Sequence, residues 1–449
     1  MNEDKKQTIY AFLLNGASKF VTYLLLLILA NLYAINVYGE SAFIMAFFDI
    51  ITFFVVIGLP YIFVPWVINK KEIYTIFYFL LILNLILIMI GSVITIFKPV
   101  VFPLVIALPF VLFYNFGSSF LRIDHKYGLV QFFNVFLIFV TLIFAFVFKE
   151  FNQLGIIGSY ALGYIIPTFF IVYITKNHFK NIFSKFNINY KIILEYFKKG
   201  IIVSLIILSF NFLSWIDSSV LGIMSTFENV ARYNISMKLS SVIPLIPLAL
   251  SMFLLTRTSE LQNHKVSLNV LKRTMRISYF ISLLGSVTIV SFLPLIIKFF
   301  FPAYSGIELY TSILITGVLF YTVYFLEYTS LTGKLEPEKA FIPLVSSALL
   351  NLILDILLVP QFGIYGICFA TMLANMLAFT LLTIQHKIMK EFIWVYLLSF
   401  IVLLAYYLGY YGLILIPILV PLLFLLKLIH LEDIKVIKET IFGMLHIKI

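Results

Sequence analysis

The sequence contains one apolar run of about 20 residues after another, with only short polar stretches between them. A helix of that length crosses a hydrocarbon layer roughly 30 Å thick. Segments such as Tyr23–Ala30 and Leu80–Ile90 are almost continuously apolar and lack the alternation that strands of a membrane barrel would show. Hydrophobic residues make up 62% of the chain and charged residues 11%, which excludes a water-soluble fold. The sequence therefore predicts an all-α integral membrane protein.

The apolar runs predict about fourteen membrane-spanning helices, arranged as two pseudo-symmetric lobes of about six helices each and a final hairpin. We expect an N-terminal lobe over 1–180, a cytoplasmic linker over 181–199 and a C-terminal lobe over 200–388. The extra hairpin and a cytoplasmic tail are expected over 389–449. The linker falls in the longest polar stretch, Lys176–Lys199, which separates the two halves.

A short repeat supports the division into two halves. Gly155-Ile156-Ile157-Gly158 opens the last span of the first half, and Gly363-Ile364-Tyr365-Gly366 opens the last span of the second. Small residues at this spacing let membrane helices approach closely. Prolines also interrupt the second span of each half, namely Pro60, Pro65, Pro244 and Pro247. Such prolines weaken a helix at a point where transport would require it to bend. The alternative interpretation of the repeat is a gene duplication kept for packing, which requires no transport.

Basic residues are concentrated in alternate loops, which predicts the orientation of the chain. The loops on one side hold only Lys98, Lys149, Arg232 and Lys298, and the other basic loop residues lie on the opposite side. Because basic loops stay in the cytoplasm, we expect a protein of the cytoplasmic membrane with both termini inside. The net charge of +11 then faces anionic lipid headgroups and does not indicate a nucleic-acid site.

Charged residues inside the predicted spans carry most information, because such groups are costly in lipid and normally face a bundle interior or water. Asn15 and Lys19 lie one helical turn apart on the first span, and Asp49 lies on the second. At about 1.5 Å per residue, Lys19 and Asp49 fall at a similar depth. We therefore predict a lysine–aspartate pair in the first half.

The second half shows the opposite arrangement of signs. Asp217 shares the seventh span with Asn211, and Lys238 follows Asn234 by one turn on the eighth. Further candidates within or at the ends of spans are Arg122, Arg232, Glu327, Asn351 and Asp355. Both halves are thus predicted to carry an acid and a base on neighbouring helices.

Two interpretations of these charges remain open. They are either structural pairs that fix helix register, or the lining of a hydrated cavity that binds a ligand. Arg122 presents the same choice, between an inner-loop cluster with Asp124, His125 and Lys126 and a place in the cavity.

Metal sites and enzyme chemistry find no support in the sequence. All six histidines fall in predicted loops or the C-terminal tail, and Cys368 is the single cysteine, so no metal is expected. No nucleotide-binding glycine loop, HExxH pair or Gly-x-Ser-x-Gly elbow occurs. We therefore expect a protein that is not an enzyme and that holds no cofactor.

Several local motifs are similar to those of a known family. They are Tyr38-Gly39-Glu40, Gly58-Leu59-Pro60, Asp217–Gly222, Tyr233–Leu239, and Asn351–Pro360 leading into Gly363–Gly366. On these motifs residues 10–385 resemble polysaccharide flippases of the Wzx type, within the MATE/MOP exporter superfamily. The resemblance implies a MATE-like bundle. It also implies that undecaprenyl-diphosphate-linked oligosaccharide repeat units are moved across the membrane by alternating access, for O-antigen or capsule synthesis.

The resemblance also implies roles for the intramembrane charges. The substrate diphosphate is anionic, so Lys19 and Lys238 are its expected partners, with Arg122 and Arg232 as further candidates. The cavity acids would hold these cations, bind sugar hydroxyls, or carry a coupling proton or sodium ion. These acids are Asp49, Asp217, Glu327 and Asp355. The implied partners are the lipid-linked oligosaccharide, membrane lipids and the polysaccharide polymerase machinery.

One departure from the superfamily pattern bears on two other functions. The first span carries Lys19 where many cation-coupled drug exporters of the superfamily carry an acid. This disfavours a cation-coupled multidrug or small-molecule exporter without excluding it, because several acids remain available. A non-transporting scaffold of a glycan-assembly complex is the third possibility, and its function would survive removal of the charges in every span.

Overall fold

The computed structural model describes residues 3–56, 73–184, 189–260, 264–334 and 336–425, and in these ranges it is helical without a β-strand. Ten of the described helices are long and apolar enough to cross a membrane. The number is eleven if the bent pair Ser204–Phe210 and Trp215–Met224 is counted as one span. The predicted all-helical membrane class is therefore confirmed, and the helix count agrees roughly with the predicted fourteen.

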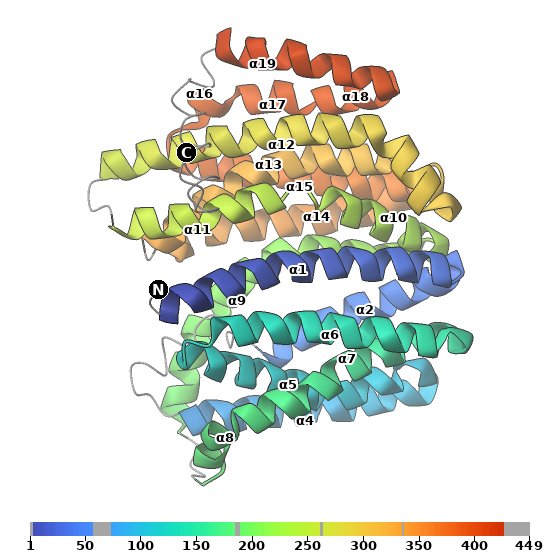
Figure 1. The fold of residues 1–449 in the computed structure, drawn as a ribbon, viewed down its shortest axis with the longest axis vertical. Helices are drawn as coiled ribbons and strands as arrows, with labels where there is room; N and C mark the ends of the chain where they lie inside the picture. The colour runs from blue at the N-terminus through green and yellow to red at the C-terminus, as the bar shows by residue number, and fades with distance from the viewer. Residues whose placement is uncertain (1–2, 57–72, 185–188, 261–263, 335, 426–449) are drawn as a thin grey trace. The chain divides into compact units, whose positions relative to one another are not determined.

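The chain divides into two compact units, Met1–Ala231 and Arg232–Ile449, with the division inside α10 (Phe227–Ser240). These units are defined by spatial contacts, whereas the predicted lobes were defined by the sequence repeat. The predicted lobe boundaries therefore stay a prediction. Figure 1 shows the helices of the first unit. They are α1 (Glu3–Leu32), α2 (Ile35–Val55), α4 (Ile73–Phe97), η1 (Pro99–Val101), α5 (Phe102–Ile123), α6 (Tyr127–Val147), η2 (Lys149–Phe151), α7 (Asn152–Ile174), α8 (Lys176–Phe183) and α9 (Tyr190–Met224).

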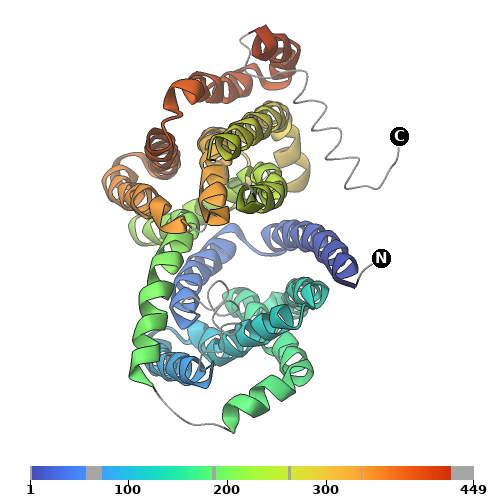
Figure 2. The ribbon, with the colours of Figure 1, turned by 90° about the vertical axis from the view of Figure 1, so that its left-hand side faces the viewer.

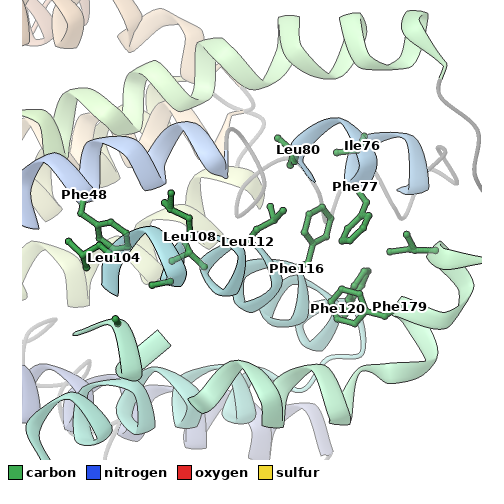
Figure 3. Packing of buried hydrophobic residues seen from close by; sticks show 14 of the residues in the cluster. Phe48, Ile76, Phe77, Leu80, Leu104, Leu108, Leu112, Phe116, Phe120 and Phe179 are labelled. Carbon is green, nitrogen blue, oxygen red and sulfur yellow. The ribbon is translucent and has the colours of Figure 1, made fainter. Parts of the chain in front are cut away.

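A stripe of apolar side chains on α5 forms the core of the first unit. Leu104, Leu108, Leu112, Phe116 and Phe120 lie at every fourth position, so they share one face of the helix. Figure 3 shows this row packed against three other helices. Its partners are Phe48 on α2, Ile76, Phe77 and Leu80 on α4, and Phe179 on α8. In lipid such packing stabilises helix association through dispersion contacts.

Glycines bring α2 against α9 and the start of α10. A Cβ atom on Gly222 of α9 would overlap the ring of Phe43, and one on Gly39 of α2 would overlap the backbone carbonyl of Phe227. No side chain larger than hydrogen fits at either place without movement of its neighbour. Because α9 packs on α2 in this way, it belongs by contacts to the first unit.

The second unit is built around α13 (Glu308–Gly333), whose side chains are almost all buried. Its neighbours include α11, α12, α15 and α18. In Figure 2 several helices of this unit are viewed close to end-on, as expected for helices that run in roughly the same direction within it. The other elements are α11 (Leu245–Glu260), α12 (His264–Phe300), η3 (Pro302–Tyr304), η4 (Pro337–Ala340), α14 (Phe341–Phe362), α15 (Ile364–Gln385), α16 (Met389–Phe392), α17 (Trp394–Ser399), α18 (Ile401–Leu408), η5 (Gly409–Ile414) and α19 (Leu415–Leu425).

The C-terminal helices pack on the rest of the second unit. The hydroxyl of Tyr279 on α12 lies 2.9 Å from that of Ser399 on α17, and it also donates to the carbonyl of Val395. Farther along, α18 and η5 contact α12. The predicted hairpin is thus anchored to the second unit by α12 and α13.

The structure gives the start of α9 and the break near Pro244. The polar stretch 176–199 contains α8 and the first turns of α9, which begins at Tyr190 rather than near residue 200. The break predicted at Pro244 is present, because α10 ends at Ser240 and α11 begins only at Leu245. Pro60 and Pro65 lie outside the described residues.

Candidate functional site

The two lysines predicted to meet a ligand, Lys19 and Lys238, lie exposed on their helices. Lys19 is exposed on α1 of the first unit, and Lys238 is exposed on α10 of the second, where Asn234 is half-buried. Neither α1 nor α10 is among the ten candidate spans of the described residues, and Lys238 lies in the last turn of α10, so the place of both lysines inside the membrane stays a prediction. The side chains of Asn15 and Asn211 lie outside the described part of the structure.

The acids of the first unit are less accessible than its lysine. Asp217 on α9 is fully buried, and the serines that follow it, Ser218 and Ser219, are buried as well. Asp49 on α2 is half-buried and lies within electrostatic range of Tyr160 and Tyr164 on α7. The proposed pairing and shared depth of Lys19 and Asp49 stay a prediction, as does the pairing of Asp217 with Lys238.

The two candidate arginines take part in contacts at the ends of helices. Arg122 is half-buried in the last turn of α5, and Asp124 just beyond it lies 3.1 Å from His178 of α8 and 3.7 Å from Lys126. Arg232 donates from Nη1 to the carbonyl of Ser305 over 2.8 Å. Arg232 therefore holds the connector between α12 and α13, and a ligand role for either arginine stays a prediction.

A polar row on α14 lies inside the second unit. The hydroxyl of Ser347 donates to the carbonyl of Ala374 on α15 over 2.6 Å. One and two turns later on the same face, the amide of Asn351 donates to the Asp355 carboxylate over 3.0 Å, and both residues are fully buried. Such groups hold neighbouring membrane helices together, so this row fits the structural interpretation of the charges.

Buried polar bonds also join α13 to α15 and to the loop that follows α15. Tyr324 donates to Oδ1 of Asn375 over 2.7 Å. One turn later, Oε2 of Glu327 lies 2.7 Å from Nδ1 of His386, and the carboxylate is completely inaccessible. Its second oxygen, Oε1, has no hydrogen-bond partner among the described residues. Glu327 is thus tied to the protein interior through a single histidine.

His386 is the residue that the sequence prediction missed, because a histidine in a predicted loop was given no role. The internal repeat carried the signal. His386 follows Gly366 at the same distance along the chain as His178 follows Gly158. Each histidine bonds an acid from the helix two spans earlier, Asp124 directly after α5 in the first unit and Glu327 within α13 in the second, although these two acids are not at equivalent places in the repeat.

The surface of the bundle is apolar over long stretches. On α4, Leu85, Met89 and Ile96 are 52%, 63% and 75% exposed. So many exposed apolar side chains on one helix would be unfavourable in water. Lipid is the matching environment. No group of three or more His, Cys, Asp or Glu residues is placed to hold a metal ion in the part of the chain that the structure describes.

These features define a multi-pass membrane protein built from two helical units. The chain is similar to the structure of the lipid II flippase MurJ in an inward closed conformation. The TM-score is 0.72 at 17% identity, over 97% of this chain and 99% of that one. The known structures in this comparison are transporters and flippases.

Two structures of a multidrug resistance MATE family transporter of the MOP superfamily also match. The inward-facing one has a TM-score of 0.61 at 14% identity over 89% of this chain and 96% of that chain. The outward-facing one has a TM-score of 0.59 at 14% identity over 89% and 97%. No protein-family model and no curated protein sequence matches the chain. The chain therefore has the fold of the MOP superfamily.

Proposed function

We propose that this protein is a Wzx-type flippase that moves undecaprenyl-diphosphate-linked oligosaccharide units across the cytoplasmic membrane by alternating access. The fold shared with a lipid II flippase supports a substrate in which a lipid carries a charged headgroup. The proposal places both termini in the cytoplasm. It requires no catalysis by the protein and leaves open a coupling proton or sodium ion.

One observation carries the choice of an anionic substrate: the candidate lysines are exposed, and most candidate acids are buried. Lys19 and Lys238 are exposed, whereas Asp217, Glu327 and Asp355 have no accessible surface. A ligand in contact with the exposed helix faces would meet positive charge. Ammonium groups suit a diphosphate, because charge-assisted hydrogen bonds to phosphate oxygens are short and strong.

The same observation disfavours export of cationic drugs, the function suggested by similarity to the MATE transporters. A cationic drug needs an accessible carboxylate. Glu327 is engaged by His386 and Asp355 by Asn351 inside the second unit. Asp49, which is half-buried, is the acid that a drug could reach most easily.

Deletion of the gene in its native host tests the proposal. Surface glycan and lipid-linked repeat units would be quantified together with susceptibility to cationic drugs. We expect surface glycan to be lost and lipid-linked units to accumulate, with drug susceptibility unchanged. Unchanged glycan with raised drug susceptibility would overturn the flippase proposal and make the exporter the better account.

A further inference from the structure

A cavity of about 400 Å³ opens in the second unit where α13 and α15 end. It is bounded by the segment after α13 and the segment after α15. Its lining residues are Leu331, Lys334, Glu336, Lys339, Gln385, His386 and Lys387. Four of these seven side chains are basic residue types, and a single one is acidic.

The cavity lies directly beyond the ends of two candidate membrane spans. The membrane-spanning stretches Glu308–Gly333 and Ile364–Gln385 end directly before the lining residues Lys334 and His386. Residues just beyond a span lie in the interfacial region, where headgroups and water meet. The excess of basic residues in this set of loops places the cavity on the predicted cytoplasmic side.

The lining has an uncompensated positive charge. Lys339 pairs with Glu336 at 2.7 Å, and His386 is bonded to the buried Glu327. Lys334 and Lys387 remain, so the cavity lining carries a net charge of about +2 once both pairs are set aside. Burial lowers the pKa of Lys334, and Lys339 lowers it further while Glu336 raises it. An anion beside Lys334 would relieve this unfavourable environment.

The backbone of Lys387 ends α15 in a left-handed conformation. Lys387 has a φ of +58°, in the left-handed region. The amide of Lys387 donates to the carbonyl of Ile384 and that of Ile388 to the carbonyl of Thr383. This is the helix-ending motif in which glycine is the favoured residue at the position of Lys387. The motif places the Lys387 side chain at the cavity wall at a small cost in backbone strain, and it also occurs at His125 after α5, so it does not by itself mark a site.

The two walls are tied together by a direct bond. Nε2 of Gln385 donates to the carbonyl of Lys339 over 3.1 Å. This bond holds the segment after α13 beside the segment after α15, so Lys339 and Lys387 line one cavity although both are exposed.

We propose that this cavity binds a phosphoryl group that carries two negative charges, as in a diphosphate or a phosphate monoester. Lys334 and Lys387 would be its direct partners, with Lys339 exchanging between Glu336 and the anion. The inference goes beyond the proposed transport function, because it concerns binding at the membrane surface and holds whether or not the ligand is moved. The phosphoryl group could belong to a lipid headgroup or to a soluble molecule, and the same chemistry would recognise both.

The test uses the full-length protein in phosphatidylcholine nanodiscs. Inorganic diphosphate is titrated by calorimetry, and retention of a long-chain prenyl diphosphate added to the nanodisc is measured by native mass spectrometry. The variants are Lys334→Gln and Lys387→Gly, and the matched control is Lys390→Gln, an exposed lysine one turn away that does not line the cavity. We expect each cavity variant to bind about tenfold more weakly, and the control to bind as the native protein does.

The cavity variants are chosen so that loss of binding is not loss of folding. Lys387→Gly relieves backbone strain and Lys334→Gln removes a partly desolvated charge, so we expect neither to lower the melting temperature. Lysine-dependent binding of both probes would support a site that reads the phosphate alone. Lysine-dependent retention of the prenyl diphosphate alone would support a lipid source. The proposal is overturned if neither probe binds, or if both cavity variants bind as tightly as the native protein.

Discussion

The imidazole of His386 and the carboxylate of Glu327 form a buried hydrogen bond of 2.7 Å, in which Glu327 has no accessible surface and His386 keeps 14%. The equivalent histidine of the first unit, His178, lies 3.1 Å from Asp124, and there both side chains are about a third exposed. His178 and His386 occupy equivalent places in the repeat, but Asp124 and Glu327 do not, and only the pair in the second unit is buried. The two pairs should differ sharply in energy.

Replacement of His386 by alanine should destabilise the protein strongly. The change would leave Glu327 buried without its partner, and loss of the partner of a buried polar group costs about 1–3 kcal/mol, and more when that group is charged. The same change at His178 should cost less than about 1 kcal/mol, because exposed pairs are weak. Thermal unfolding of His386→Ala and His178→Ala in one detergent compares them directly.

A double variant separates the charge from the packing. Replacing both Glu327 and His386 by leucine removes the buried charge and its partner together, so most of the stability lost in His386→Ala should return. Equal losses at His178 and His386, or a double variant no more stable than His386→Ala, would show that burial of the pair does not determine its energy.

The fold class could be predicted from the sequence because a chain surrounded by lipid has few possible backbone structures. Apolar runs of spanning length must become helices, since no other structure satisfies the backbone in lipid without closing a barrel. The break at Pro244 followed from the missing backbone donor of proline. The start of α9 at Tyr190 did not, because polar residues at the end of a membrane helix look like a loop in a hydropathy pattern.

The candidate site could be predicted from the sequence only in part. Asp217, Glu327 and Asp355 were recognised as intramembrane acids, but whether a side chain faces a cavity or a neighbouring helix depends on packing between segments far apart in the chain. Asn351 and Asp355 share a face with Ser347, which bonds to Ala374. That contact is between helices and leaves no mark in the local pattern. The role of His386 required the repeat to be compared position by position.

Gly39 and Gly158 are both in sequence motifs, and they should respond differently to substitution. A methyl group on Gly39 would meet the backbone carbonyl of Phe227, which cannot move as a side chain can, whereas nothing lies within 4 Å of a Cβ atom on Gly158. Gly39→Ala should destabilise by about 1–3 kcal/mol. Gly158→Ala should be neutral or stabilising by up to about 1 kcal/mol, because alanine favours a helix. Melting temperatures of the two variants measure this, and a harmless Gly39→Ala would mean that α2 and α10 are not in close contact there.

The hydrogen bond between Tyr324 and Asn375 should contribute modestly to the second unit. Tyr324→Phe deletes the hydroxyl and leaves Oδ1 of Asn375 without the donor that reaches it over 2.7 Å. Hydrogen bonds between membrane helices contribute about 0.6–1.7 kcal/mol, and a loss in this range is expected. Tyr173→Phe is the control, since Tyr173 is 69% exposed. If both variants melt at the native temperature, the bond between α13 and α15 contributes nothing measurable.

Neutralisation of the exposed intramembrane lysines should impair transport without loss of stability. Lys19→Gln and Lys238→Gln each remove a charge from an exposed position, so the free energy of unfolding should change by less than about 0.5 kcal/mol. If a diphosphate passes these residues, each change should slow its movement by about tenfold, and arginine should restore part of the rate because it keeps the charge. The assay follows a fluorescent lipid-linked diphosphate in proteoliposomes with a reagent that reaches the outer leaflet alone. Lys298→Gln, an exposed lysine in the last turn of α12, is the matched control. A transport rate that survives in both Lys19→Gln and Lys238→Gln would show that the substrate does not depend on these cations, and the half-buried Asp49 would become the next residue to test.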